Sequence, residues 1–343
     1  MMQKLWNRFR LAGRVLLKGD SASRQLRAVP AITPDEVAEA REFFPLDKFF
    51  IYGHARSGTT LLTRLIRLHP DVHCNYQGHF FTRQPTLEGL VNHADIEDWF
   101  TRSSNRWNRG RDLSPVVLRA AADYIMEREA RPLGAKIVGD KSPNNLLNGQ
   151  AVDLAHKIYP DGRIVFIVRD GRDAAVSHRF QNFIDAPQHL SQADLEIRAA
   201  FERDPDPFLS GQRSIFTANA IRRAAEDWVR NVTETDARGR ELYGDRYISL
   251  SYEDLLSAPW EQMECLWAFL GVVTDLPELP EILQAELGSN PDRDWQRQKA
   301  GELVSPLQKG KSGSWRDLFT ERDKAIFREA AGEALDRWGY DWP

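Results

Sequence analysis

Short runs of apolar residues alternate along the chain with longer stretches in which apolar residues recur every three or four positions. The short runs predict β-strands, and the longer stretches predict helices. The run "IVFIV" is apolar at every position, as expected for a strand covered on both faces. Strands are predicted at 48–53, 71–75, 135–139, 163–169 and 247–251, and helices at 59–68, 150–158, 173–183, 218–235, 259–270 and 321–338. This alternation predicts an α/β fold in three α/β/α layers, with a central, mainly parallel sheet of about five strands.

Two long polar intervals interrupt the alternation, at 82–112 and 184–216. The first contains "TRSSNRWNRGRD" and the second contains "ERDPDPFLSGQRS". Long connections in a compact domain are often binding loops, and disorder is the competing explanation. No internal repeat and no linker rich in Pro, Gly or Ser divides the chain. Residues 47–343 are therefore interpreted as a single domain in which the two intervals form substrate loops.

Residues 1–46 predict a basic helical extension before this domain. The first 30 residues carry seven Lys or Arg and one Asp, and Leu5, Phe9, Ala12 and Leu16 would line one face of a helix. Such a segment can rest on an anionic membrane surface. We favour the simpler interpretation, a helix that packs on the domain or frays. No apolar run has transmembrane length and no secretory signal is visible, so a cytoplasmic protein is expected.

Composition limits the classes of partner. The formal net charge of −4 gives no reason to expect nucleic-acid binding, so any anion site must be a local cluster of Arg and Lys. Cys74 and Cys265 lie far apart in the sequence, which indicates neither a disulfide framework nor a cysteine-rich zinc site. His69 and His73 have the spacing of a helical metal pair, but Pro70 lies between them. We therefore expect no metal.

The stretch "FFIYGHARSGTTLL" at 49–62 predicts a buried strand, a glycine-containing turn and a helix. It nearly matches the phosphate loop G-x-x-x-x-G-K-[ST], but Thr59 occupies the lysine position. Successive backbone N–H groups would still point into one concavity at the positive end of the helix. The pattern predicts a P-loop-like anion site formed by Arg56, Ser57, Gly58, Thr59 and Thr60, and a turn without a ligand is the alternative.

A second strand–turn–helix pattern lies at 162–180, in "GRIVFIVRDGRDAAVSHRF". In a doubly wound sheet both loops open at the carboxyl edge, where ligands bind. Arg169 could bind a phosphate through two hydrogen bonds there, while Ser177 donates its hydroxyl. The alternative is a solvated cluster of surface ion pairs. A third stretch, "LQKGKSGSWRDLFT" at 307–320, predicts a cationic loop before a helix.

Together, the three elements resemble the family of sulfotransferases that use 3′-phosphoadenosine 5′-phosphosulfate (PAPS). "ARSGTTLL" resembles the family's loop for the 5′-phosphosulfate, and "VRDGRDAAVSHRF" resembles its 3′-phosphate segment, with Arg169 and Ser177 at the family's spacing. "QKGKSGSW" is similar to the C-terminal loop R-K-G-x-x-G-x-W, with Gln308 in place of arginine. The resemblance implies that Lys309 and Gly310 contact the donor.

Two further stretches extend the resemblance. Tyr252, in "YISLSYEDLL", falls where the family approaches the adenine. "RSGTTLLTRLIRLHPDVHC", the "RDGR" turn and the final "WGYDWP" resemble the tyrosylprotein-sulfotransferase-like branch, and "GDKSP" resembles its lysine motif, which implies that Lys141 lies near the reacting groups. The resemblance implies PAPS as co-substrate and no essential Mg²⁺. The acceptor stays open between glycan, lipid, peptide and small molecule.

Sulfuryl transfer moves an SO₃ group, roughly in line, from a phosphate leaving group to an acceptor hydroxyl or amine. The protein must neutralise the charge that grows on the bridging oxygen. Arg56 is the candidate, because a guanidinium stays charged and offers a fork of donors. The branch carries a glutamate after its second strand, but "CNYQGHFF" has Tyr76 and Gln77 there. We therefore take His79 as the first candidate for the base that accepts the proton, and Asp140 as the second.

Two other classes of function remain open. A P-loop kinase or NTPase is opposed by Thr59 at the lysine position and by the Arg169 element, which ATP does not need. An inactive nucleotide-binding module that recognises a glycan or a protein is supported by the missing carboxylate at Gln77. The presence of Arg56 and Lys141 opposes that alternative.

Overall fold

The computed structural model describes residues 27–104, 106–108, 110–289 and 312–342. Within them, five strands form one parallel sheet in the order β2-β3-β1-β4-β5. The strands are β1 (Asp47–Gly53), β2 (Val72–Tyr76), β3 (Ile137–Lys141), β4 (Arg163–Val168) and β5 (Tyr247–Ser251). The strand order reverses at β1, which lies between β3 and β4. Ligands of α/β sheets bind at such a reversal, beyond the carboxyl ends of the strands.

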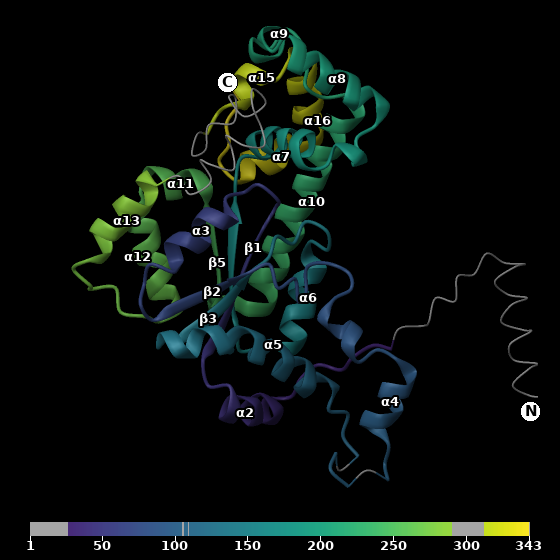
Figure 1. The fold of residues 1–343 in the computed structure, drawn as a ribbon, viewed down its shortest axis with the longest axis vertical. Helices are drawn as coiled ribbons and strands as arrows, with labels where there is room; N and C mark the ends of the chain where they lie inside the picture. Colours follow the sequence, from purple (N-terminus) through teal and green to yellow (C-terminus); the bar gives the residue numbers. More distant parts are fainter. Residues whose placement is uncertain (1–26, 105, 109, 290–311, 343) are drawn as a thin grey trace, which may run out of the picture.

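Helices cover both faces of the sheet (Figure 1). One layer contains α3 (Thr59–Ile66), α11 (Tyr252–Ser257), α12 (Pro259–Leu270) and α13 (Leu279–Gly288). The other layer is built around α10 (Ala218–Tyr243), which packs on α6 (Gly149–Ile158), α7 (Gly171–Asp185) and α16 (Glu321–Arg337), with α5 (Ser114–Ala130) beside α6. The three-layer α/β/α arrangement that the sequence predicts is confirmed.

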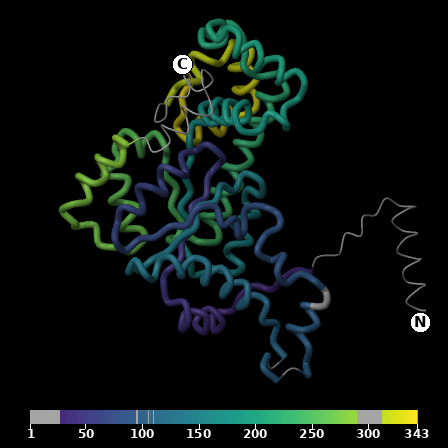
Figure 2. Tube along the Cα trace, in the orientation of Figure 1, coloured from purple at the N-terminus to yellow at the C-terminus, as the bar shows by residue number. Residues whose placement is uncertain are grey.

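Shorter elements complete the described chain. They are the helices α2 (Pro34–Phe43), α4 (Ala94–Thr101), α8 (Gln192–Arg203), α9 (Asp206–Leu209) and α15 (Trp315–Leu318), and the 3₁₀ turns η1 (Leu87–Leu90), η2 (Arg131–Leu133), η3 (Pro187–His189) and η4 (Gly244–Arg246). Figure 2 traces the chain through them: α8, α9 and α15 lie at one end of the molecule, and α2 and α4 lie at the other (Figure 1).

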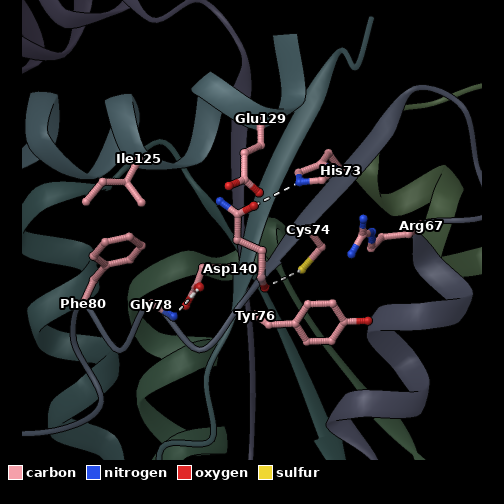
Figure 3. Close-up of a pocket in the computed structure, with 10 residues that line it drawn as sticks. Arg67, His73, Cys74, Tyr76, Gly78, Phe80, Ile125, Glu129 and Asp140 are labelled. Atoms are coloured by element: carbon pink, nitrogen blue, oxygen red, sulfur yellow. Dashed lines mark hydrogen bonds between the residues drawn. The ribbon is translucent and has the colours of Figure 1, made fainter. Parts of the chain in front are cut away.

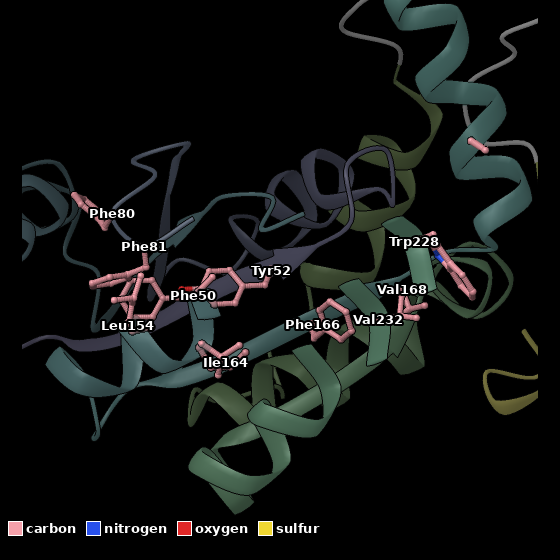
Figure 4. Close-up of a cluster of buried hydrophobic side chains, with 14 of the residues drawn as sticks. Phe50, Tyr52, Phe80, Phe81, Leu154, Ile164, Phe166, Val168, Trp228 and Val232 are labelled. Carbon is pink, nitrogen blue, oxygen red and sulfur yellow. The ribbon is translucent and has the colours of Figure 1, made fainter. Parts of the chain in front are cut away.

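Alternate residues of the central strands enter two separate cores. In β1, Phe50 and Tyr52 join the core beneath α6 and α10, whereas Phe49 and Ile51 join the core beneath α3 and α12. The ring of Phe50 meets that of Phe81 edge to face, with 5.6 Å between centroids (Figure 4). Burial on both faces explains why these strands are apolar at successive positions. It also gives the loops beyond the strands a rigid base.

Strand β3 begins and ends two residues later than predicted, at Ile137–Lys141 instead of 135–139. Asp140 and Lys141 therefore belong to the strand, where they are the Cα partners of Phe50 and Ile51 in β1, and both are only 2% exposed. The sequence pattern misses this because charged residues are rarely buried in a central strand.

The polar interval 184–216 contains α8 and α9 and is not simply a loop. Helix α8 begins with a capping box, in which Ser191 and Asp194 each bind the other's backbone N–H. The four letters "SQAD" carry this signal, but the polar residues around them obscure it. Interval 82–112 contains η1 and α4, and α4 lies at the end of the molecule away from α7 and α11 (Figure 1). The substrate role predicted for the intervals 82–112 and 184–216 stays a prediction.

Much of the predicted N-terminal extension, residues 1–26 with Leu5, Phe9, Ala12 and Leu16, lies outside the described residues. The later part contains α2, which packs against α5, and the Ile32 N–H donates to the Lys157 carbonyl at 2.9 Å. None of the helices in the described ranges is long and apolar enough to cross a membrane.

A buried ion cluster ties β1 to α5. The Nζ of Lys48 lies 2.7 Å from Glu127 Oε1 and 3.3 Å from Asp123 Oδ1, and it donates to the Leu46 carbonyl at 2.6 Å. All three charged side chains are at most 2% exposed. Each carboxylate also has an arginine partner: Arg131 Nη2 lies 2.6 Å from Glu127 Oε2, and Arg119 Nε lies 3.5 Å from Asp123 Oδ2. Lys48 is the cation that the two carboxylates share.

Replacing Lys48 with Met should lower the free energy of unfolding by about 3 kcal/mol, the lower end of the range for breaking a buried ion pair, because the two buried carboxylates lose their shared cation but keep one arginine each. Urea denaturation followed by circular dichroism measures this change. Lys136→Met is the matched control: the Lys136 side chain is 71% exposed, pairs with Asp71 at 2.8 Å, and should contribute only about 0–1 kcal/mol. If Lys48→Met and Lys136→Met lowered the free energy of unfolding equally, the stabilising role assigned to the buried ion cluster would be wrong.

Candidate active site

The loop between β1 and α3 forms the compact turn that the sequence predicts. The Ser57 N–H donates to the His54 carbonyl at 3.1 Å, and Arg56 has a positive φ of 72°. Gly58 has a φ of 88°, and a Cβ there would lie 2.2 Å from the ring of Tyr252, so the position requires glycine. The Ser57 hydroxyl is buried and has no hydrogen-bond partner among the described residues. An anion held by the loop would give this hydroxyl an acceptor.

The two predicted loops meet at the carboxyl edge of the sheet, because β1 and β4 are neighbours. Arg56 Nε donates to Ser177 Oγ at 3.1 Å, and Arg169 Nη1 donates to the carbonyl of Arg56 at 3.0 Å. The guanidinium of Arg169 lies 4.8 Å from the ring centroid of Tyr252. Side chains from three separate sequence motifs therefore form one cluster.

Positive charge dominates this cluster. Burial, followed by the charge of Arg169, lowers the pKa of Arg56, which still remains a cation at neutral pH. Burial lowers the pKa of His54 to about 4, and burial followed by Arg56 lowers that of His178. The two histidines are therefore neutral near pH 7, and the two arginines carry the charge. A bound anion would relieve the repulsion between the arginines.

Lys141 lies beside the phosphate loop. Thr59 and Thr60 open α3, and the Nζ of Lys141 lies 3.4 Å from Thr60 Oγ1 and 5.2 Å from the ring centroid of Tyr76. Burial lowers the pKa of Lys141, and the charge of Arg56 acts in the same direction. The structure places Lys141 beside this loop, and its position near the reacting groups, which the resemblance implies, stays a prediction.

The third motif is described only at its end, because Lys309 and Gly310 lie outside the described residues. Their contacts with a donor therefore stay predictions. The residues that follow are anchored to α7: Asp173 Oδ1 accepts from Ser314 Oγ at 2.9 Å and from the Trp315 N–H at 3.1 Å. The sequence did not single out Asp173, because its conspicuous neighbours were the two arginines of "RDGRD".

Asn144 is a second residue that sequence reasoning missed. Its side-chain Oδ1 accepts from the Gly53 N–H at 3.2 Å, and its backbone N–H donates to the Gly53 carbonyl at 3.2 Å. Its side-chain Nδ2 donates to Thr235 Oγ1 at 2.8 Å. These bonds fix the point where β1 enters the phosphate loop. The signal in the sequence is the polar pair that directly follows "GDKSP".

The two candidate bases belong to one hydrogen-bond network at the ends of β2 and β3. Asp140 Oδ1 accepts from the Gly78 N–H at 2.8 Å, and Asp140 Oδ2 accepts from Ser142 Oγ at 2.6 Å. Ser142 Oγ in turn accepts from the His79 N–H at 3.0 Å. Gln77 and His79 have positive φ values of 56° and 50°, so the network holds a strained turn.

Burial raises the pKa of Asp140 to about 6, although hydrogen bonds from Ser142 and Gly78 oppose the shift. His79 is half-buried, and burial followed by the charges of Arg83 and Lys141 lowers its pKa. Its Nδ1 lies 2.8 Å from the Thr82 hydroxyl. Near pH 7 both groups are largely in the form that accepts a proton.

A pocket of about 310 Å³ opens beside this network (Figure 3). Its walls include the aromatic Tyr76 and Phe80, the apolar Ile125, the charged Arg67 and Glu129, and the carboxylate of Asp140. His79 does not line it. Of the two candidate bases, Asp140 is therefore the one that lines this pocket.

No group of three or more His, Cys, Asp or Glu side chains suited to a metal ion occurs in the part of the chain that the structure describes. The two histidines that the sequence offered as a pair have separate partners. His69 Nε2 lies 2.6 Å from the Val273 carbonyl, and His73 Nε2 lies 2.9 Å from Asn75 Oδ1.

Comparison with known proteins supplies the family. The sequence model of the sulfotransferase family matches residues 48–275. The chain belongs to the sulfotransferase family. The matched segment includes the loop between β1 and α3, the turn after β4, Lys141 and Tyr252, and it ends before the third motif. Membership confirms the resemblance drawn from the sequence motifs.

Curated relatives of this sulfotransferase include the protein-tyrosine sulfotransferase of Drosophila melanogaster, 25% identical over 268 residues, which are 75% of this chain and 45% of the fly protein. Protein-tyrosine sulfotransferase A of Caenorhabditis elegans is 22% identical over 302 residues, which are 85% of this chain and 67% of the worm protein. The chain thus spans about half the length of the fly relative.

Similar solved structures include sulfotransferases. Mouse sulfotransferase SULT7A1 complexed with PAP has a TM-score of 0.47 at 19% identity, with 84% of this chain and 85% of the mouse chain covered. The sulfotransferase domain of the Synechococcus PCC 7002 olefin synthase has a TM-score of 0.47 at 17% identity, with 87% of this chain and 96% of that domain covered.

Proposed function

We propose that the protein transfers a sulfuryl group from PAPS to an acceptor hydroxyl. The hydrogen bond from Arg56 to Ser177 is the observation that carries this proposal, because it joins two anion-binding elements at one edge of the sheet. PAPS has phosphate groups at both the 5′ and 3′ positions of one ribose and so needs two such elements. ATP carries all its phosphates on the 5′ side and needs one.

In this proposal, different residues of the described chain bind different groups of PAPS. The N–H groups of Gly58, Thr59 and Thr60, at the start of α3, suit the 5′-phosphosulfate, and so does the Ser57 hydroxyl, which has no partner among the described residues. Arg169 and Ser177 suit the 3′-phosphate, and the ring of Tyr252 offers a face for the adenine. Lys309 and Gly310 complete this assignment from the third motif.

In the reaction, the acceptor oxygen attacks the sulfur and forms a new S–O bond. The S–O bond to the 5′-phosphate breaks, and its electron pair stays on the bridging oxygen of the departing adenosine 3′,5′-bisphosphate. Arg56 and Lys141 lie beside the loop that holds this phosphate, so their charges stabilise the leaving oxygen. Both side chains are largely buried, which strengthens the interaction relative to water.

We assign the acceptor's proton to the carboxylate of Asp140, and we place His79 second. Asp140 lines the pocket, and its raised pKa of about 6 makes it a stronger base than an ordinary carboxylate. His79 contributes its N–H to the same network through Ser142. It therefore helps to hold the turn that donates to Asp140.

The pocket also bears on the acceptor. Tyr76 and Phe80 give it two aromatic walls, which suit an aromatic ring. The two curated relatives are named protein-tyrosine sulfotransferases. We infer that the acceptor is a phenolic hydroxyl, on a peptide or on a small molecule.

Calorimetric titration tests the donor. Adenosine 3′,5′-bisphosphate should bind at least about 10-fold more tightly than either AMP or ATP with Mg²⁺, since a hydrogen bond to a charged group is worth about 1.5–3 kcal/mol. Arg169→Ala should remove this advantage and leave AMP binding nearly unchanged. Tight binding of ATP with no response to the bisphosphate would favour a kinase or NTPase instead.

The pH profile of kcat/KM tests the base. Only the deprotonated carboxylate accepts a proton, so activity should rise with pH through an apparent pKa near 6. Asp140→Asn keeps the size of the side chain and should lower kcat by about 10²–10⁴-fold and abolish this limb. His79→Ala should retain the limb. If the rise in kcat/KM near pH 6 persisted in Asp140→Asn and disappeared in His79→Ala, His79 would be the base instead of Asp140.

Transfer of ³⁵S from labelled PAPS tests the acceptor. A tyrosine-containing peptide and a simple phenol should be labelled, whereas the same peptide with Tyr replaced by Ser should not, because an aliphatic hydroxyl is far less acidic. Arg56→Ala should abolish labelling of every acceptor. Labelling of a glycan or a lipid with no labelling of phenols would refute the inferred acceptor class while leaving the donor assignment intact.

A further inference from the structure

The proposed 3′-phosphate site depends on the turn at 169–172, which other parts of the chain hold in place. From α10, the Nε1 of Trp228 donates to the Arg169 carbonyl at 3.0 Å. Gly171 permits this approach, because a Cβ there would lie 2.5 Å from the Trp228 ring. The backbone of the turn is therefore fixed at the residue that carries the guanidinium.

A second support reaches the turn through Glu253. Its Oε1 accepts from the Asp170 N–H at 3.2 Å, and its Oε2 accepts from the Tyr340 hydroxyl at 2.9 Å. Glu253 directly follows Tyr252, whose ring lies against the guanidinium of Arg169. Burial raises the pKa of Glu253, and the hydrogen bond from Tyr340 opposes the shift. Tyr340 thus favours the carboxylate form that accepts from the turn.

A third support holds the end of the turn. Arg172 Nη1 donates to the Asp341 carbonyl at 3.0 Å. Its guanidinium lies against two indoles, 4.0 Å from the ring centroid of Trp315 and 4.7 Å from that of Trp342. Arg172 also binds the Asp170 carboxylate, with Nη2 and Oδ2 2.8 Å apart. Residues 340–342 therefore reach both ends of the turn.

We propose that residues 340–342, which follow α16 in "WGYDWP", form a positioning element for the 3′-phosphate of the donor. The segment acts through Glu253 and Arg172, and the turn that they hold presents Arg169. This inference rests on the proposed function. Because the segment supports only the 3′ side of the site, its loss should weaken ligands that carry a 3′-phosphate and spare those that lack one.

Tyr340→Phe in the full chain tests the proposal by removing one hydroxyl. Calorimetry should show about 10-fold weaker binding of adenosine 3′,5′-bisphosphate, the usual effect of one hydrogen bond to a charged group, and less than about twofold change for AMP. The KM for PAPS should rise by a similar factor, with kcat within about twofold. Trp342→Leu, which removes the indole from Arg172, should act in the same direction and provides a second variant.

Tyr247→Phe is the matched control. The Tyr247 hydroxyl donates to Asp236 Oδ1 at 2.8 Å, in a similar buried setting at the amino end of β5. This variant should bind the bisphosphate as the wild type does. The inference is overturned if Tyr340→Phe and Trp342→Leu bind the bisphosphate normally, if they weaken both ligands alike, or if the control weakens it equally. A wild-type chain that does not bind the bisphosphate would overturn the proposed function, and this inference with it.

Discussion

The close approach of β1 and β4 at their carboxyl ends is the constraint on which the site depends. Gly53 pairs with Ile167, and a Cβ on Gly53 would lie 2.8 Å from the Ile167 carbonyl oxygen, so no larger residue fits there. The loops that leave these strands are then near enough for Arg56 to bond with Ser177, across 121 positions of sequence. A glycine at the end of one strand thus makes a single site out of two separate loops.

The elements that could be predicted from the sequence are those whose own residues, or their close neighbours in the chain, carry the pattern. The strands are apolar at successive positions, and the phosphate loop has its glycine where φ is 88° and a ring closes over it. The position of Asp140 had no local signal, because its burial comes from Phe50 beside it in the sheet and from the turn at 77–79. Its pKa of about 6 is a property of that tertiary environment. The supports from Trp228 and Tyr340 likewise join residues distant in sequence.

The register of β2 and β3 bears on the missing glutamate. Asn75 is paired with Asp140, and Tyr76 with Lys141, so the end of β2 lies directly beside a carboxylate on the neighbouring strand. Asp140 on β3 therefore places a carboxylate next to the end of β2, where the sequence has Tyr76 and Gln77. The positive φ of Gln77 and His79 follows from this arrangement, since the turn must present the Gly78 N–H to Asp140. The strained turn thus supplies one of the hydrogen bonds that the buried Asp140 carboxylate accepts.

A net charge of −4 means that the protein as a whole does not attract an anionic donor. Affinity must come from a few cations held in fixed positions, because charges farther away are screened beyond about 10 Å. Arg56 and Arg169 repel each other, and their geometry persists only because surrounding groups hold it. Tyr252 lies against one guanidinium, Ser177 accepts from the other, and the Arg56 carbonyl accepts from Arg169. The rigidity of the turn at 169–172 is therefore an electrostatic requirement of the site, since two like charges in a flexible loop would separate before a donor could bridge them.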